Sequence, residues 1–392
     1  MKRSSIFIII FLLGFVFISS DLMGIPAFAR KYKMSCKTCH EPFPKLKAFG
    51  EEFAANGYVL KDQEPSRAFT ETGDDELTLI RDFPLAIRFD GFVKYNNGNT
   101  RTSDFAAPMN LKLLSGGVLA KNISYYFYFF FSEKGKIVGL EDAFLTFTDL
   151  FHSGIGLTVG QFQVSDPIFK RELRLTFEDY NIYKAKNGFS NIDLTYDRGI
   201  VLNYSISKGP DLFLEVVNGS GIGEANIFEN FDSDKYKNVF GRISQNFGKH
   251  FRLGASGYYG KEAQEEIINK ITIWGADATI NFQGAQLNFQ YMERRDDNPF
   301  FLLLNSNPDK IKIKGGFAEL IVNPPSKDNR FYMVGLFNWI KADDEELDYR
   351  SGAVHFGYLV RRNIRLVTEL DYIFKGPEGK HARALLGLIA GF

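Results

Sequence analysis

From Pro84 to the end of the chain, apolar and polar residues alternate with a period of two, in segments of about ten residues. The run Ala285-Gln286-Leu287-Asn288-Phe289-Gln290-Tyr291 places Leu, Phe and Tyr on one face and Gln and Asn on the other. The segment Asn363–Phe374 divides in the same way. Successive side chains of a β-strand point to opposite faces, so these segments are predicted to be strands with one face toward lipid and one toward water.

We expect about sixteen such strands, a number within the range of outer-membrane barrels. They are predicted at 84–95, 109–120, 122–133, 141–149, 154–164, 199–207, 211–218, 237–247, 250–260, 270–282, 285–294, 312–323, 330–340, 350–360, 363–374 and 382–392. Soluble sandwiches also alternate, but their strands tend to be shorter and their outer faces carry charge rather than Phe and Tyr.

The predicted connections alternate between long and tight. Long ones are Asn96–Pro108, Ser165–Arg198, Gly219–Tyr236, Arg295–Ile311 and Lys341–Tyr349; tight ones are Lys121, Lys208–Pro210, Gly248–Lys249, Gln283–Gly284 and Arg361–Arg362. This asymmetry is typical of outer-membrane barrels, whose turns are short on the periplasmic side. We therefore predict an all-β, transmembrane antiparallel β-barrel with both termini in the periplasm. Ser165–Arg198 is too long for an idle loop and is expected to fold inward as a constriction.

Composition agrees with a barrel in lipid. The chain has 40 Phe and 18 Tyr, yet its mean hydropathy is only −0.16, as expected where apolar and polar residues alternate. Lys plus Arg balances Asp plus Glu at 47 each, so no bulk charge points to nucleic acid as a partner. The final segment ends in Phe392 and resembles the terminal signal recognised for insertion of bacterial outer-membrane proteins.

The N-terminus is typical of an export signal. Lys2 and Arg3 precede an apolar run from Ile6 to Ile18, which is short for a membrane-spanning helix. We assign residues 1–24 to a signal peptide, with cleavage expected between residues 20 and 29. An uncleaved inner-membrane anchor is the alternative.

The only two cysteines lie in Cys36-Lys37-Thr38-Cys39-His40. A Cys-x-x-Cys-His run is typical of covalent c-type haem attachment, with two thioether bonds and the imidazole as axial iron ligand. A zinc ribbon would need a second ligand pair, and a thioredoxin-like dithiol would lie in a βαβ pattern that the sequence lacks. A disulfide between Cys36 and Cys39 is the plainest alternative, but it leaves His40 unexplained.

A short helix is expected after the motif, with Pro44 in its first turn and Asn56-Gly57 at its C-terminal cap. In it Leu46, Phe49 and Phe53 form one apolar stripe, predicted to face the porphyrin or the barrel wall. The sixth iron ligand is left open, with Met34 and His355 as candidates. The remaining histidines, His152, His250 and His381, are expected in turns or loops.

These N-terminal residues resemble the fused monohaem cytochrome–porin family of bacterial outer-membrane proteins, which includes iron-oxidising cytochromes. The resemblance covers about 35 residues and rests on Pro26-x-Phe28-Ala29-Arg30, Cys36-x-x-Cys39-His40, Phe43-Pro44-x-Leu46, Phe49-Gly50, Phe53 and Gly57-Tyr58. It implies one covalent haem c and electron transfer from extracellular Fe(II) to a periplasmic carrier. The chain has Lys31-Tyr32-Lys33 where iron-oxidising relatives commonly have Gln-Thr-Gly.

Three units are therefore expected: residues 1–24 as signal, 25–80 as a monohaem segment inserted in the lumen, and 81–392 as the barrel. A haem-gated or haem-sensing porin for solutes and electron export to an extracellular acceptor are the alternative functions; a periplasmic cytochrome fused to a soluble β domain is an alternative architecture. The acidic pairs and runs at Asp296-Asp297 and Asp343–Glu346 are expected in external loops, where carboxylates could collect ferrous iron. No nucleophile with a positioned base points to hydrolysis.

Overall fold

The computed structural model describes residues 27–40, 46–58, 60, 69–74, 76–98, 101–169, 175–303, 310–324 and 329–392. The expected signal peptide and Pro44 lie outside these residues. No helix in the described part of the chain is long and apolar enough to cross a membrane.

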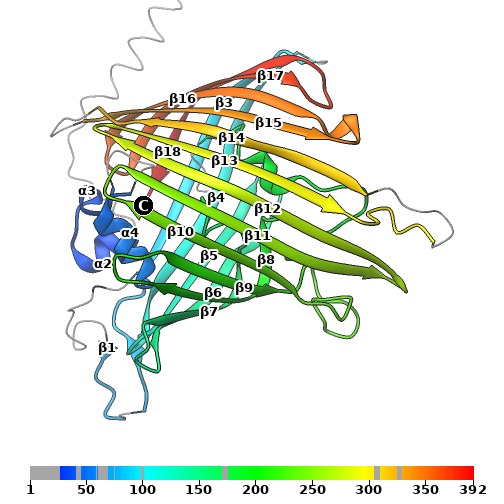
Figure 1. The fold of residues 1–392 in the computed structure, drawn as a ribbon. Helices are drawn as coiled ribbons and strands as arrows, with labels where there is room; N and C mark the ends of the chain where they lie inside the picture. The colour runs from blue at the N-terminus through cyan, green and yellow to red at the C-terminus, as the bar shows by residue number, and fades with distance from the viewer. Residues whose placement is uncertain are drawn as a thin grey trace, which may run out of the picture.

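Sixteen antiparallel strands form one closed barrel, as predicted (Figure 1). They are β3 (Leu85–Asn96), β4 (Thr102–Ala120), β5 (Ile123–Glu133), β6 (Gly139–Leu150), β7 (Ile155–Gln163), β8 (Tyr196–Ser205), β9 (Asp211–Val217), β10 (Asn238–Phe247), β11 (Phe251–Gln264), β12 (Ile267–Phe282), β13 (Ala285–Asp296), β14 (Ile311–Val322), β15 (Phe331–Ala342), β16 (Tyr349–Arg361), β17 (Ile364–Lys375) and β18 (His381–Gly391). Each strand pairs with its neighbours in sequence, and β18 closes the ring on β3.

The strands keep the predicted alternation. In β17, Leu366, Leu370 and Tyr372 are exposed on the outer surface, while Arg365, Glu369 and Asp371 are buried inside the barrel. Exposed Phe, Leu, Ile, Val and Trp side chains occur on the outer face of most strands. This surface is suited to the hydrocarbon layer, so the fold is that of a transmembrane β-barrel.

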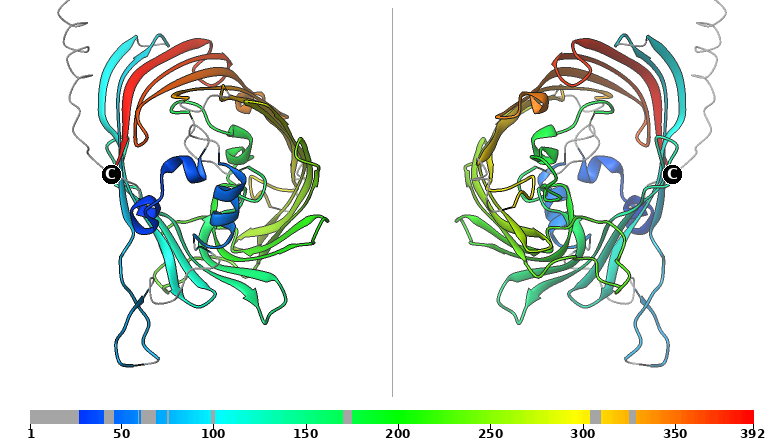
Figure 2. Two further views of the ribbon diagram at one scale, coloured as in Figure 1. Left: turned by 90° about the vertical axis from the view of Figure 1, so that its left-hand side faces the viewer. Right: turned by 90° about the vertical axis from the view of Figure 1, so that its right-hand side faces the viewer.

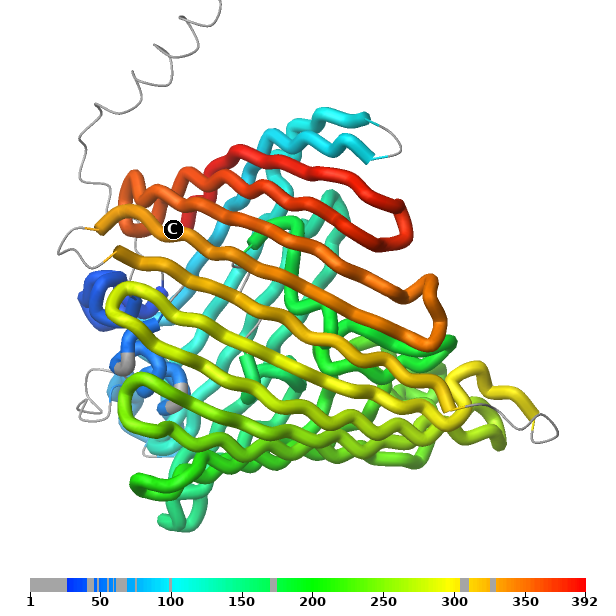
Figure 3. The backbone as a smooth tube through the Cα atoms, turned by 45° about the horizontal axis from the view of Figure 1, so that its top comes forward, coloured from blue at the N-terminus to red at the C-terminus, as the bar shows by residue number. Residues whose placement is uncertain are grey.

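The two ends of the barrel differ (Figure 3). One end, here called the short-turn end, carries tight turns such as Gln283–Gly284, the C-terminus and the N-terminal helices. The opposite end, the long-loop end, carries connections such as 218–237 and 297–310. The link predicted at Asn96–Pro108 is too long, because β4 begins at Thr102. The first residues of β4 pair with β3, and the pairing continues beyond a register shift next to Gly91.

Before the barrel lie three short helices, α2 (Ala27–Tyr32), α3 (Cys36–Cys39) and α4 (Ala48–Ala55), and a small hairpin of β1 (Phe69–Thr70) and β2 (Leu79–Ile80) that the sequence did not predict. The helix expected after the motif begins later than predicted. Leu46 forms a β-bridge with His40, and α4 starts two residues further on. Its predicted end is confirmed: Asn56 is the C-cap, and Gly57 follows with a φ of +67°.

Candidate functional site

The haem-attachment motif forms a compact turn at the short-turn end of the barrel. The Oγ of Ser35 accepts a hydrogen bond from the N–H of Lys37 at 3.3 Å and caps α3. The N–H of His40 donates to the carbonyl oxygen of Cys36 at 2.8 Å, which fixes the histidine directly after the helix. The two cysteines are free thiols. Burial raises the pKa of both, so both are neutral thiols at neutral pH.

Helix α4 packs directly against this turn. The N–H of Lys47 donates to the carbonyl oxygen of Cys39 at 2.8 Å. One turn later, a Cβ atom on Gly50 would lie 2.3 Å from the same oxygen. The absence of a side chain at Gly50 therefore permits the close approach of α4 to the cysteines.

An aromatic cluster joins the helices to the barrel wall. Phe28 stacks on Tyr58 with ring centroids 4.7 Å apart, and Tyr58 stacks on Tyr126 of β5 at 5.0 Å. Phe53 contacts the edges of Phe28 and Tyr58 and is only 5% exposed. The guanidinium of Arg30 also donates to the carbonyl oxygen of Leu85 at 2.9 Å. These contacts hold the helical segment at the mouth of the barrel. In the view along the barrel, the blue helices lie partly beside the wall and partly inside the ring of strands (Figure 2).

A cavity of about 770 Å³ lies between the motif and the inner wall of the barrel. On the motif side it is lined by Met34, Cys36, Cys39, His40, Leu46 and Phe53; on the wall side apolar residues include Ile87, Leu114, Tyr126, Tyr128, Phe130, Leu359 and Ile389. Its volume falls in the range of about 300–1,000 Å³ found for ligand and cofactor sites.

The predicted stripe is only partly correct. Phe53 and Leu46 line the cavity, but Phe49 does not. Phe49 is 40% exposed and stacks on Phe53 at 6.4 Å instead. Phe49 and Phe53 lie on one face of α4, whereas Leu46 precedes the helix and reaches the cavity from the turn after the motif, so the three residues do not form a single helical stripe.

The residues around the cavity fit a haem c. Both cysteines and His40 line one largely apolar space, together with three arginines of the barrel, Arg88, Arg362 and Arg365; the carboxylates Glu133, Glu141, Asp142 and Asp166 also line it. Guanidinium groups suit the two carboxylates of a porphyrin, while the aromatic and aliphatic lining suits its ring. Arg362 lies close enough to Cys36 to favour its thiolate form.

The structure places the two candidates for the sixth iron ligand in different surroundings. Met34 lines the cavity beside the motif. His355 does not: it is buried on β16, where Nδ1 lies 2.8 Å from Oε2 of Glu369 and Nε2 lies 3.3 Å from the hydroxyl of Tyr332. With both ring nitrogens engaged in the wall, the candidacy of His355 is wrong. Met34 stays a prediction.

The long connection after β7 folds into the lumen, as predicted. We call residues 164–195, of which 170–174 are not described, the inward segment; it contains a 3₁₀ turn at Asn181–Lys184. Tyr180 stacks on Phe317 of β14 with centroids 4.0 Å apart, and Ile182, Tyr183 and Ile192 are buried with it. Inward-facing residues of the wall complete an apolar core inside the barrel: Ile271, Ile273, Met292, Ile313, Ile321, Val334 and Leu336.

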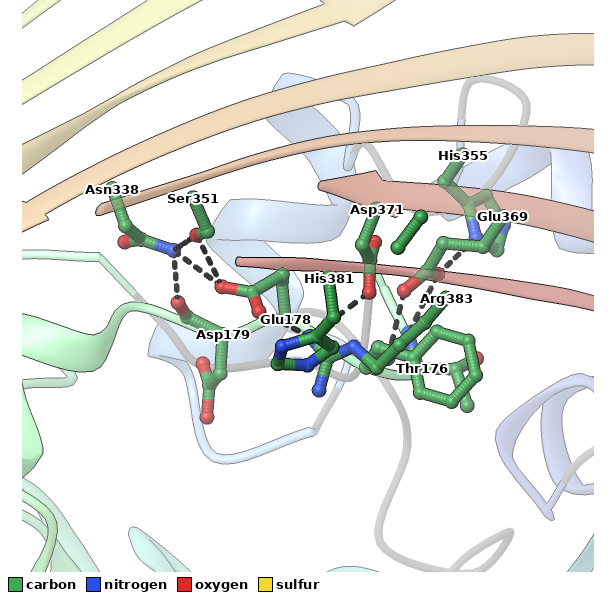
Figure 4. Close-up of polar contacts among 12 residues, drawn as sticks. Thr176, Glu178, Asp179, Asn338, Ser351, His355, Glu369, Asp371, His381 and Arg383 are labelled. Atoms are coloured by element: carbon green, nitrogen blue, oxygen red, sulfur yellow. Dashed lines mark hydrogen bonds and ion pairs between the residues drawn. The ribbon is translucent and has the colours of Figure 1, made fainter. Parts of the chain in front are cut away.

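Two carboxylates anchor the inward segment to the wall, and sequence reasoning did not single out either contact (Figure 4). Glu369 of β17 accepts backbone N–H bonds from Thr176 and Phe177, both at 2.7 Å. Glu178 of the segment accepts from Ser351 at 2.6 Å and forms an ion pair with Arg383. The alternation placed Glu369 inside the barrel, but no local pattern marks Glu178.

The acidic pair Asp296-Asp297 is not an exposed loop as expected. Asp296 ends β13, is fully buried and is bound by Arg294 at 2.8 Å and by Asn187 of the inward segment at 2.7 Å. Asp343–Glu346 are exposed at the long-loop end. Among the described residues, no group of three or more His, Cys, Asp or Glu side chains is arranged to hold a metal ion.

Comparisons with known proteins show the fold. No family model matches the chain, and neither does any curated protein. The barrel superposes on an anion-selective porin from Comamonas acidovorans with a TM-score of 0.57 and 12% identity, over 79% of this chain and 99% of that one. A porin refined at 1.8 Å resolution has a TM-score of 0.55 and 12% identity, over 79% of this chain and 100% of that one. OprB of Pseudomonas putida has a TM-score of 0.54 and 12% identity, over 79% of this chain and 94% of that one. The chain therefore has a porin-like, sixteen-stranded barrel.

Proposed function

We propose that this chain is an outer-membrane monohaem c-type cytochrome that carries electrons across the membrane, from extracellular Fe(II) to a carrier in the periplasm. One observation carries the proposal: Cys36, Cys39 and His40 line a cavity that lies between the helical segment and the inner wall of a porin-like barrel. The cytochrome–porin resemblance of the N-terminal residues supports the haem and the external donor. The short-turn end and both termini are then periplasmic.

Each group around the cavity has a defined task in this proposal. Cys36 and Cys39 hold the haem by thioether bonds, and His40 supplies an axial nitrogen. Phe53, Tyr58 and Tyr126 keep water from the ring on the side of the helices. Arg362 and Arg365 offer positive charge on the wall for its carboxylates, whereas Arg88 is already paired with Asp90 at 2.7 Å. When bound, the haem supplies a one-electron couple: each Fe(II) oxidised to Fe(III) outside releases the one electron that the carrier accepts.

Inside the barrel, the packing of the inward segment favours a wire over an open channel. Water-filled porins have polar lumens, whereas here Tyr180, Tyr183 and Phe317 belong to an apolar core within the lumen. Such a core opposes the free passage of ions while leaving the cavity at the short-turn end open to the haem.

The test is rapid mixing of the purified, detergent-solubilised protein with Fe(II) while the haem absorbance is followed. The proposal predicts reduction of the haem, and no signal from protein with both cysteines replaced by alanine. A haem that reduces readily with a soluble periplasmic-type donor but never with Fe(II) would contradict the direction and the donor.

The likeness to porins favours a second candidate, a barrel for solute passage that the haem segment gates. The two differ in conductance. Only the gated porin predicts solute flux through the full-length protein that changes with the redox state of the haem.

A further inference from the structure

A row of hydrogen-bonded side chains runs along the inner wall of the barrel from the cavity to the inward segment. We call it the relay; its members, in order, are Arg365 of β17, Tyr332 of β15, His355 of β16 and Glu369 of β17. The first member lines the cavity. The last accepts the backbone N–H bonds of Thr176 and Phe177 (Figure 4). The relay therefore links the cavity to the anchor of the inward segment.

The bonds of the relay lie away from water. The guanidinium of Arg365 donates to the hydroxyl oxygen of Tyr332 at 3.0 Å, and this hydroxyl lies 3.3 Å from Nε2 of His355. Nδ1 of His355 lies 2.8 Å from Oε2 of Glu369. Arg365 is 7% exposed, and the other three members are at most 1% exposed. Hydrogen bonds are electrostatically stronger in such low-dielectric surroundings than in water.

All bonds of the relay have the same direction. Glu369 already accepts two backbone N–H bonds, so its oxygens act as acceptors and Nδ1 of His355 donates. In the neutral imidazole, Nε2 then has a lone pair that accepts the hydroxyl hydrogen of Tyr332. The oxygen of Tyr332 in turn accepts from Arg365. Bonds aligned in this way polarise one another, so a change at the cavity alters the bonds at the anchor.

The wall leaves room for Tyr332 to reach Arg365. The two residues belong to β15 and β17, which are separated by β16, and Tyr332 lies opposite Gly357 of β16. A Cβ atom on Gly357 would lie 2.1 Å from the ring of Tyr332. Without that atom the ring can lie across β16, where it stacks on His355 with centroids 5.7 Å apart. A side chain at position 357 would therefore interrupt the relay without changing any of its members.

We propose that the relay couples the haem to the inward segment, so that a haem carboxylate bound by Arg365 strengthens the anchor of the segment. A bound carboxylate fixes the guanidinium by a charge-assisted hydrogen bond. The hydroxyl of Tyr332 and the ring of His355 are then fixed in turn, and Glu369 holds the backbone of the segment more firmly. In a barrel without haem the segment is held more loosely. This inference rests on the proposed function, because that function places the haem in the cavity.

The test is amide hydrogen exchange at Thr176 and Phe177, measured by mass spectrometry on the full-length protein in detergent. Exchange of these two amides reports local opening of the anchor. Haem-loaded protein is compared with the unloaded variant Cys36→Ala/Cys39→Ala. The proposal predicts that the loaded protein exchanges these amides at least about fivefold more slowly, which is the lower end of typical coupling between two sites.

Two variants interrupt the relay but keep a donor for Glu369. Tyr332→Phe removes only the hydroxyl. His355→Asn keeps an N–H group beside Glu369 but is too short to reach Tyr332. Tyr332 and His355 are positioning residues in this account, since they act through Arg365 and Glu369. In both variants, made with and without the cysteines, the loaded and unloaded forms should exchange at the rate of the unloaded, otherwise unchanged protein.

A glycine pair and a second tyrosine supply the matched controls. Gly357→Ala should displace the ring of Tyr332 and remove the difference between loaded and unloaded protein. Gly335→Ala should keep the difference, because no atom lies within 4 Å of a Cβ at that position of β15. Tyr372→Phe, on the outer surface of β17, should also keep it.

Three results would overturn the coupling. The first is equal exchange in loaded and unloaded protein without further substitutions, and the second is a difference that survives in Tyr332→Phe. The third is exchange in both forms of Tyr332→Phe that is faster than in the unloaded protein, which would give the hydroxyl a purely structural role. Haem staining of each sample separates these failures from that of the proposed function: a chain that carries no covalent haem would overturn the proposed function and the coupling with it.

Discussion

Gly50 is the residue on which the geometry of the motif depends most closely. A Cβ atom there would lie 2.3 Å from the carbonyl oxygen of Cys39, so Gly50→Ala must push α4 away from the cysteines. Overpacking of this kind costs about 1–3 kcal/mol, more than the roughly 1 kcal/mol that alanine gains in helix propensity. We expect a lower haem content per barrel and an altered haem spectrum.

Gly223→Ala is the matched control, because no atom lies within 4 Å of a Cβ at Gly223. Haem content, measured by absorbance against protein concentration, should be unchanged in this variant. Normal loading and spectrum in Gly50→Ala would show that the approach of α4 does not matter for the haem.

Variants of the two cysteines and of His40 are expected to distinguish covalent attachment of the haem from ligation of its iron. Cys36→Ala combined with Cys39→Ala should abolish haem staining after denaturing electrophoresis, because both thioether positions are lost. His40→Ala should keep some covalent haem but change its spectrum. Staining that survives in the double cysteine variant would refute covalent attachment at this motif.

Among the elements, the strands were the most predictable. Alternation with a period of two is a local signal, and it located every strand of the barrel to within a few residues except the start of β4. That strand was predicted from residue 109, whereas Thr102–Ala106 continues the pairing with β3. The start of α4 was also misplaced: Pro44 suggested a first turn, but Leu46 is bridged to His40.

Long-range contacts were beyond the reach of the sequence. The inward folding of the segment after β7 followed from its length and aromatic content, but its anchors join residues far apart in the chain. Glu178 and Arg383 are 205 positions apart, and Thr176 and Glu369 are 193 apart. The position of His355 on an inward face was predicted, yet its engagement by Glu369 and Tyr332 depends on neighbouring strands whose register the sequence did not supply.

The inward segment is expected to depend on Glu369. Its two carboxylate oxygens accept from Thr176 and Phe177, and one of them also contacts the ring of His355. Glu369→Gln would turn an N–H group of the amide toward one of these donors. Breaking a buried, charged network of this kind costs about 3–5 kcal/mol, so the segment should detach from the wall.

Limited proteolysis of the folded barrel and conductance in planar bilayers would measure this detachment. Glu369→Gln should be cut within the inward segment and should conduct more than the unchanged protein. Glu224→Gln, an exposed carboxylate in a loop at the same end, should do neither. Unchanged protection in Glu369→Gln would mean that the apolar core alone holds the segment.

At the scale of the whole molecule, the barrel is filled from both ends. The helical segment and its cavity occupy the short-turn end, and the inward segment packs an apolar core further along the lumen. A porin-like wall is thus combined with an interior that opposes water.

The most direct measurement is electron transfer across a sealed vesicle. Vesicles containing the purified protein would hold a trapped, oxidised, membrane-impermeant dye; a parallel set would hold a trapped Fe(II) chelator. After Fe(II) is added outside, the account predicts reduction of the dye without coloration of the chelator, and neither signal with Cys36→Ala/Cys39→Ala. A dye that stays oxidised, or a chelator that colours at the same rate as the dye is reduced, would contradict the transmembrane wire.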